Sequence, residues 1–135
     1  MDFEPNLNIL QVSELLQVVS PQTRLEIILA IGMGEVCVCH LEAVLKQRQA
    51  YISQHLMALR EAGVISARRE GRYIFYRLER PAVLALVQQA MRIAGQSPET
   101  IQESMRLAAQ GCNCPTCAPA ADGLAGQSCS GQIEL

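Results

Sequence analysis

The stretch that decides the fold is QAYISQHLMALREAGVISARREGRYIFYRL, residues 49–78. Its first part carries apolar side chains at Ile52, Leu56 and Leu59, which is the i, i+4, i+7 spacing of one helix face. Gly63 follows at the point where a helix of that phase would end. The pattern therefore predicts an amphipathic helix from about residue 49 to residue 62, with one face turned inward.

The second part predicts a β-hairpin. The runs 64–68 and 73–78 are strand-like, and Glu70-Gly71 lies between them as a turn candidate. Upstream, a short apolar segment covers about residues 39–45 and is followed by the polar turn Lys46-Gln47-Arg48. A short helix, a three-residue turn, a longer helix and a basic hairpin, in that order, are typical of a winged helix-turn-helix.

Further helices are expected on both sides of this unit, over residues 7–19, 21–31, 81–94 and 97–111. Ser20-Pro21 and Ser97-Pro98 both match a serine N-cap followed by proline. The helix over 81–94 is apolar on more than one face, so it is expected to support dimerisation.

The predicted fold is mainly α with a small β-hairpin, a winged helix-turn-helix dimerising through its terminal helices. Its domain organisation is a DNA-binding and dimerisation domain over 1–96, an additional C-terminal helix over 97–111 and a flexible Cys-rich tail over 112–135.

Charge placement favours nucleic acid even though the net charge is −2. Between Lys46 and Arg77 there are seven basic side chains against two acidic ones, so a basic surface is expected on this segment alone. The chain has no apolar run long enough to span a membrane and no basic-then-apolar start typical of a secretory signal, so a cytoplasmic protein is expected. No phosphate-binding loop is present and no C-x-x-C opens a helix in a βαβ context, so an enzyme is not supported.

The helix over 49–62 places its N-terminal side chains where a major groove would present base edges, and the hairpin arginines can meet phosphates or an adjacent minor groove. His55 lies near the buried edge of the helix and is interpreted as a packing residue. The residues expected to contact DNA are Lys46, Arg48, Gln49, Tyr51, Ser53 and Gln54 in the turn and helix, and Arg68, Arg69, Arg72 and Tyr73 in the hairpin.

The stretch from Glu35 to Leu78 resembles the ArsR/SmtB family of metalloregulatory repressors. The resemblance rests on CVCHL at 37–41, on ISQHLMALREAGVI at 52–65 and on the wing-like RREGRYIFY at 68–76, and it covers roughly residues 10–95. It implies a homodimer that binds a twofold-symmetric operator in double-stranded DNA and leaves it when an inducer binds, in control of an arsenic- or heavy-metal-resistance operon.

Six cysteines in a reducing compartment favour metal binding or redox chemistry over a disulfide framework. Cys37-Val38-Cys39 is similar to the C-V-C element of the arsenic- and cadmium-responsive branches of that family, which often reads C-V-C-D-L-C. Here His40 stands where Asp is usual and Glu42 where the third Cys would fall. The usual three-thiolate site therefore cannot be completed locally.

The tail offers the missing sulfur at Cys112, Cys114 and Cys117. We expect Cys37 and Cys39 to join one or more of these thiols, in the same subunit or across the dimer. Thiolates select soft ions, and the resemblance makes trivalent arsenic or antimony the leading inducer, with Cd, Pb or Zn as alternatives. Cys129 is interpreted as inert tail. No zinc site is expected on the helix over 81–94, which lacks Asp and His.

Three alternatives remain at this point. In the first, the tail cysteines form a separate zinc or disulfide site. In the second, the chain is a thiol redox-sensing repressor, and in the third it only scavenges metal. Helix geometry adds a condition to the interpretation of Cys37 and Cys39 as ligands of one ion. On a regular helix, residues 37 and 39 point about 200° apart, so both can ligate one ion only if the backbone there is non-helical or unwinds.

Overall fold

The computed structural model describes residues 5–111, and these form a helical body with a small sheet. Within that range the elements are α1 (Pro5–Val19), α2 (Gln22–Ile31), β1 (Glu35–Cys37), α3 (Val38–Leu45), α4 (Gln49–Glu61), β2 (Ile65–Glu70), β3 (Tyr73–Leu78), α5 (Ala82–Ile93), α6 (Pro98–Ala108) and the short 3₁₀ turn η1 (Ala109–Gly111). The predicted mainly α winged helix-turn-helix is confirmed. The tail from Cys112 onward lies outside the described residues.

The sheet is antiparallel with strand order β1-β3-β2, so it has one strand more than the predicted hairpin. Strand β1 is only three residues long and forms by pairing with β3, where Cys37 lies opposite Phe75. The hairpin turn falls at Gly71-Arg72, one residue later than predicted, and Gly71 has a φ of 63°. Glycine adopts this left-handed conformation without the strain that a Cβ would cause.

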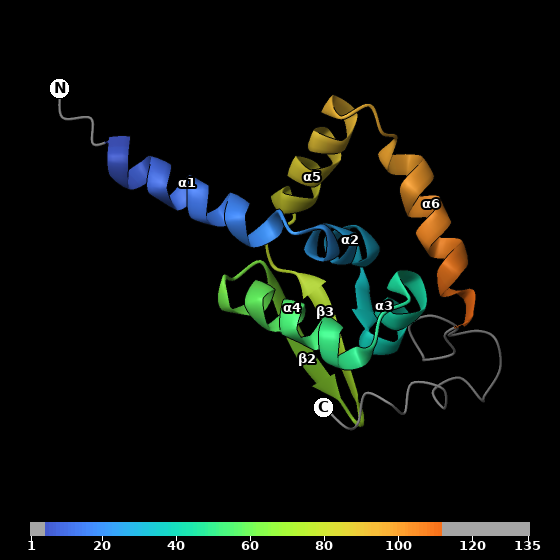
Figure 1. Cartoon of the computed structure of the whole chain (residues 1–135). Coiled ribbons are helices and arrows are strands. Elements are labelled where there is room, and N and C mark those ends of the chain that lie inside the picture. Colours follow the sequence, from blue (N-terminus) through green and yellow to red (C-terminus); the bar gives the residue numbers. More distant parts are fainter. Residues whose placement is uncertain (1–4, 112–135) are drawn as a thin grey trace.

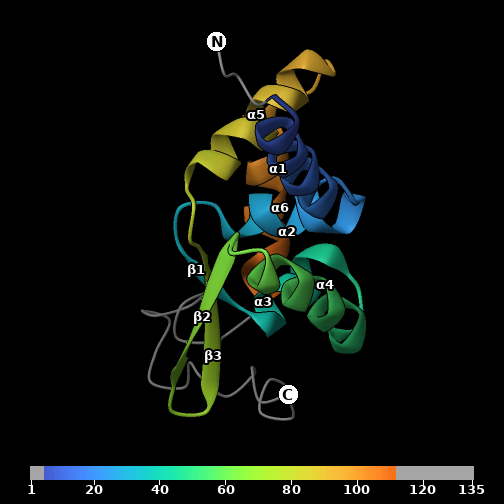
Figure 2. The same ribbon diagram turned by 90° about the vertical axis from the view of Figure 1, so that its left-hand side faces the viewer.

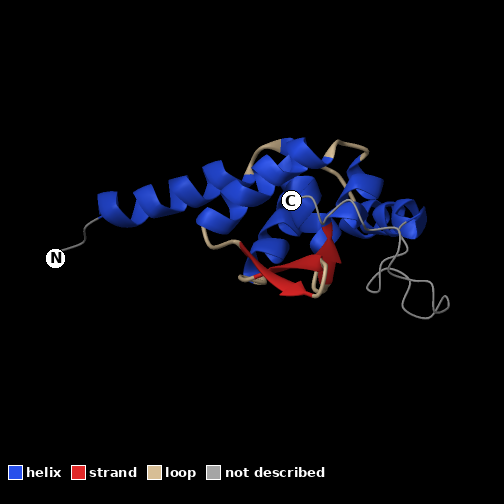
Figure 3. Ribbon diagram, turned by 90° about the horizontal axis from the view of Figure 1, so that it is seen from below, coloured by secondary structure: helices blue, strands red, loops and turns tan. Residues whose placement is uncertain are grey.

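One face of the sheet belongs to the main core (Figure 3). Residues alternate between the two faces along each strand, so Val36, Tyr76 and Leu78 point toward the helices. They pack with the largest buried side chains of the helical body, which include Ile27, Ile28, Leu41, Ile52, Leu56 and Leu59. The helices that read as amphipathic in the sequence therefore share one core with the inner face of the wing.

The outer face of the sheet holds a second, smaller cluster. Cys37, Tyr73 and Phe75 are buried there, and the partly buried Cys39 packs against them. The strand β3 is therefore covered on both faces, which agrees with its run of four apolar residues Tyr-Ile-Phe-Tyr. The thiol pair thus lies outside the main core, against the aromatic side chains of the wing.

The helices α1 and α5 lie at the end of the molecule opposite the hairpin tip (Figure 2). α1 extends away from the body (Figure 1) and exposes Ile9, Val12 and Leu16, while α5 exposes Leu86 and Ile93. No helix in the described part of the chain is both long and apolar enough to cross a membrane.

The additional C-terminal helix α6 packs against α2, α3 and α5. Ile101 and Met105 join the main core, and the Gln102 side-chain amide donates a hydrogen bond to the Leu29 carbonyl at 3.3 Å. The predicted cap of α6 is present, because the Ser97 hydroxyl accepts from the Thr100 amide at 3.3 Å. The parallel prediction for α2 is wrong: α2 begins after Pro21 with no side-chain cap. Instead the Ser20 hydroxyl donates to the Gln17 carbonyl at 3.5 Å.

Candidate nucleic-acid interface and thiol site

Helix α4 presents its apolar face to the core and its polar face to solvent. Ile52, Leu56 and Leu59 are buried, as their spacing predicted. Gln54 is exposed on the opposite side, and Met57, which the sequence reasoning did not single out, is 60% exposed three residues further on. An exposed methionine on a surface of this kind is suited to apolar contact with a thymine methyl group.

Two contacts fix α4 against α2. The Arg24 guanidinium donates a hydrogen bond from Nε to His55 Nδ1 at 3.0 Å, and the Tyr51 and Thr23 hydroxyls lie 3.2 Å apart. The rings of Tyr51 and His55 meet edge to face, with centroids 4.8 Å apart. Burial lowers the pKa of His55, and the Arg24 cation lowers it further. His55 therefore packs as a neutral acceptor, in agreement with its predicted role.

The turn between α3 and α4 carries exposed basic groups. Lys46 ends α3 with a φ of 57° and closes it by donating its amide to the Glu42 carbonyl at 2.8 Å. Arg48 precedes the first residue of α4 in an extended conformation and is exposed. Gln49, the first helical residue, is half-buried. Lys46 and Arg48 thus lie at the N-terminal end of the candidate reading helix, beside Gln49.

Burial argues against two of the residues predicted to contact DNA. The Ser53 hydroxyl is buried, with no hydrogen-bond partner among the described residues. Tyr73 is only 8% exposed and packs against Cys37 and Phe75, and its hydroxyl is likewise buried without a partner in the described part of the chain. In this conformation neither hydroxyl can reach a ligand outside the protein.

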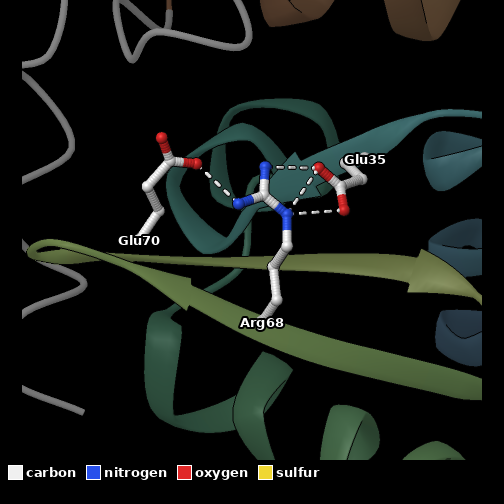
Figure 4. Close-up of polar contacts among 3 residues, drawn as sticks. All are labelled: Glu35, Arg68 and Glu70. Atoms are coloured by element: carbon white, nitrogen blue, oxygen red, sulfur yellow. Dashed lines mark hydrogen bonds and ion pairs between the residues drawn. The ribbon is translucent and has the colours of Figure 1, made fainter.

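The wing arginines differ from one another. Arg69 and Arg72 are exposed near the turn, and Arg69 donates to the Gly71 carbonyl at 3.5 Å. Arg68 is held between Glu35 of β1 and Glu70 of β2 (Figure 4). Hydrogen bonds from Arg68 hold the pKa of Glu35 below its ordinary value. Arg68 is therefore engaged within the protein, which the sequence reasoning did not anticipate.

The two sulfur atoms of the C-V-C element lie together. Cys37 is the last residue of β1, with extended angles of φ −96° and ψ 170°, and Cys39 lies in the first turn of α3. This non-helical step brings the two Sγ atoms to 2.9 Å. The condition set by helix geometry is met, and no unwinding is needed to turn both sulfurs toward one point.

The donor set fits a soft ion only in part. A tetrahedral zinc ion with Zn–S bonds of about 2.3 Å needs its sulfurs roughly 3.8 Å apart, so a small opening of the pair would suffice. Within residues 5–111 no group of three Cys, His, Asp or Glu side chains is arranged to hold a metal. Glu42, in place of the third Cys, is half-buried, and burial raises its pKa.

The predicted ligands Cys112, Cys114 and Cys117 lie outside the described residues, as does Cys129. The described chain ends beside the thiol-bearing helix, because η1 packs against α3. In the sequence Cys112 directly follows Gly111, the last residue of η1.

An exposed reading helix, a basic wing and a buried core shared by the two define a winged helix-turn-helix regulator. Residues 21–67 match the sequence model of a family described as bacterial regulatory protein, arsR family. The arsenical resistance operon repressor of Escherichia coli (strain K12) is 36% identical over 104 residues, which span 74% of this chain and 87% of that protein. This chain belongs to the arsR family and is a transcriptional repressor with a DNA-binding winged helix.

Other relatives agree with this assignment. A cadmium resistance regulator CadC homolog of Staphylococcus aureus is 31% identical over 84 residues, covering 62% of this chain and 69% of that protein. Reduced HlyU of Vibrio cholerae has a TM-score of 0.62 at 30% identity, covering 67% of this chain and 95% of that one. A homodimeric winged helix-turn-helix domain of Mycobacterium bovis has a TM-score of 0.60 at 25% identity, covering 70% and 88%.

Proposed function

We propose that this repressor binds an operator as a homodimer and releases it when a soft metal or metalloid binds Cys37 and Cys39. The observation that carries the proposal is the 2.9 Å approach of the two sulfurs at the junction of β1 and α3. Polarisable thiolates favour soft ions over Mg²⁺ or Ca²⁺. The arsenical resistance repressor among the relatives makes trivalent arsenic or antimony the first candidate, and the cadmium regulator makes Cd or Pb the second.

The third ligand is proposed to come from the tail of the same subunit. The packing of η1 on α3 supports this, since Cys112 follows Gly111 immediately. Cys114 and Cys117 follow Cys112 within a few residues, and each residue of chain extends the reach by at most about 3.6 Å. A site within one subunit therefore needs no cysteine from the partner subunit.

The proposed DNA surface combines α4 with the wing tip. The proposed contact residues are Lys46, Arg48, Gln49, Tyr51 and Gln54, with Arg69 and Arg72 on the wing; of these, only Gln49 is half-buried and the others are exposed. Ser53 and Tyr73 are left out because their hydroxyls are buried, and Arg68 is left out because its guanidinium is held by two carboxylates. Contacts from the arginines and lysine would go mainly to phosphates, and Gln54 is the candidate for base readout.

Dimerisation is proposed to use α1 and α5. Both helices expose apolar side chains at the end away from the wing, and the Mycobacterium bovis domain is homodimeric by its description. A twofold dimer presents two reading helices at a fixed spacing, so a small change in their relation weakens binding to both half-sites.

The thiol pair is connected to the reading helix by the chain itself. Cys39 lies in the first turn of α3, Leu41 anchors α3 in the core, and α3 packs directly against α4. A displacement of α3 by a bound ion would therefore be passed to α4. Coupling of about 1–3 kcal/mol, which is usual between linked sites, would weaken operator binding by roughly 5- to 150-fold.

The test is operator binding by fluorescence anisotropy, with the reduced protein and a duplex that the protein itself selects from a random pool. The complex is titrated with arsenite, antimonite, Cd(II), Pb(II), Zn(II) and peroxide. Release by a soft ion in the wild type, lost in Cys37→Ala and in Cys39→Ala, is the expected result. Cys129→Ser is the matched control and should respond as the wild type does. A wild-type response in either variant would contradict the assignment.

Thiol oxidation is the second candidate, and the same short Sγ–Sγ distance favours it. Two neighbouring thiols can form a disulfide by losing two protons and two electrons, while peroxide is reduced to water. Release by peroxide, with no response to any of the ions, would establish this function instead.

A further inference from the structure

The outer face of the sheet carries an ion pair that spans all three strands. Arg68 of β2 donates from Nε to both Glu35 carboxylate oxygens, at 2.9 and 3.1 Å, and from Nη2 to one of them at 2.8 Å. The Arg68 guanidinium lies over the Phe75 ring of β3, with its Cζ atom 5.0 Å from the ring centroid. In Figure 4 the Arg68 guanidinium faces the Glu35 carboxylate on one side and the Glu70 carboxylate on the other.

This ion pair is linked to the thiol site in two ways. Glu35 lies two residues before Cys37 on β1, and side chains two apart on a strand share a face. Phe75 is the register partner of Cys37 on one side and of Arg68 on the other. Any shift of β1 that accompanies ligand binding at Cys37 must therefore move the partner of Arg68, and Arg68 is part of the wing.

We propose that the Glu35–Arg68 ion pair couples the thiol site to the wing, so that a ligand at Cys37 changes the position of the hairpin as well as that of α4. This inference rests on the proposed function. The side chains of Arg68 and Glu35 are 50% and 26% exposed, and ion pairs so accessible to water contribute little to stability. The same property makes the pair easy to rearrange. Glu35 and Arg68 act here as positioning residues and touch neither the ion nor, in this arrangement, the DNA.

The experiment compares Glu35→Gln with Glu70→Gln. Each variant removes one carboxylate charge beside the same guanidinium, but Glu70 lies on β2 with Arg68, so only the Glu35 variant weakens the link to β1. For each protein we would measure the operator Kd without and with the ion that releases the wild type, and the affinity for that ion in the absence of DNA. The ratio of the two operator Kd values measures the coupling.

In Glu35→Gln the ratio should fall about threefold or more, the size expected when one member of a coupling network is removed. Its ion affinity without DNA should stay unchanged, and Glu70→Gln should keep the wild-type ratio. A wild-type ratio in Glu35→Gln, an equal loss in Glu70→Gln, or weakened ion binding by DNA-free Glu35→Gln would each overturn the proposal. If no soft ion releases the wild type, the proposed function fails and this coupling fails with it.

Discussion

The two thiols of the site differ in burial, and this predicts an asymmetry between them in stability. Cys37 is 0% exposed and packs against Phe75 and Tyr73, whereas Cys39 is only partly buried. Cys37→Ser puts a hydroxyl into this apolar cluster, at a cost of about 1–3 kcal/mol. With a urea m-value of about 2 kcal/mol/M, the unfolding midpoint should fall by roughly 0.5–1.5 M. Cys39→Ser should shift it far less.

The assay is urea unfolding followed by circular dichroism, under reducing conditions and at one fixed protein concentration because a dimer's stability depends on it. Cys37→Ala is the control, since it removes the thiol without burying a hydroxyl, and it should lose less than Cys37→Ser. The reasoning is refuted if the midpoint of Cys37→Ser equals that of the wild type, or if Cys39→Ser loses as much. The outcome also decides which substitution is safe for ligand studies.

Three further predictions follow from other contacts. Since burial and Arg24 lower the pKa of His55 below 6.5, the unfolded state takes up the proton first as pH falls. The urea midpoint of unfolding should thus be lower at about pH 5.5 than at about pH 7.5, and this difference should be smaller in His55→Gln than in the wild type. An equal difference in the variant would contradict the prediction. Arg72→Ala should reduce the slope of log K against log salt by about 1 if Arg72 meets one phosphate, whereas Gln54→Ala should leave that slope intact. Val12→Glu should convert dimer to monomer in sedimentation velocity without unfolding the chain, because Val12 is exposed in the single subunit; a stable dimer in this variant would exclude α1 from the interface.

Periodicity was enough to predict the reading helix. Ile52, Leu56 and Leu59 define one face of α4 whatever surrounds it, and all three are buried in the predicted core. The alternation in β3 was less informative. Its run Tyr-Ile-Phe-Tyr is apolar on both faces, a signal of burial on both sides that would have excluded Tyr73 from the DNA surface.

Contacts distant in sequence were beyond pattern reasoning. Strand β1 exists only because it pairs with β3, and three residues give no period of their own. The Glu35–Arg68 pair joins residues 33 positions apart, so nothing local distinguishes Arg68 from the exposed Arg69. The Ser20 cap failed for a related reason: the serine meets the cap pattern, but its hydroxyl bonds backward to Gln17 in α1.

The division of the sheet into two faces has an evolutionary consequence. The inner face and the helices share the main core, while the two cysteines and their aromatic neighbours form a separate cluster on the outer face. Under the proposed function, substitutions in that outer cluster would change which ion is bound without repacking the core that carries α4. One scaffold of this kind would then serve several inducers with the same reading helix.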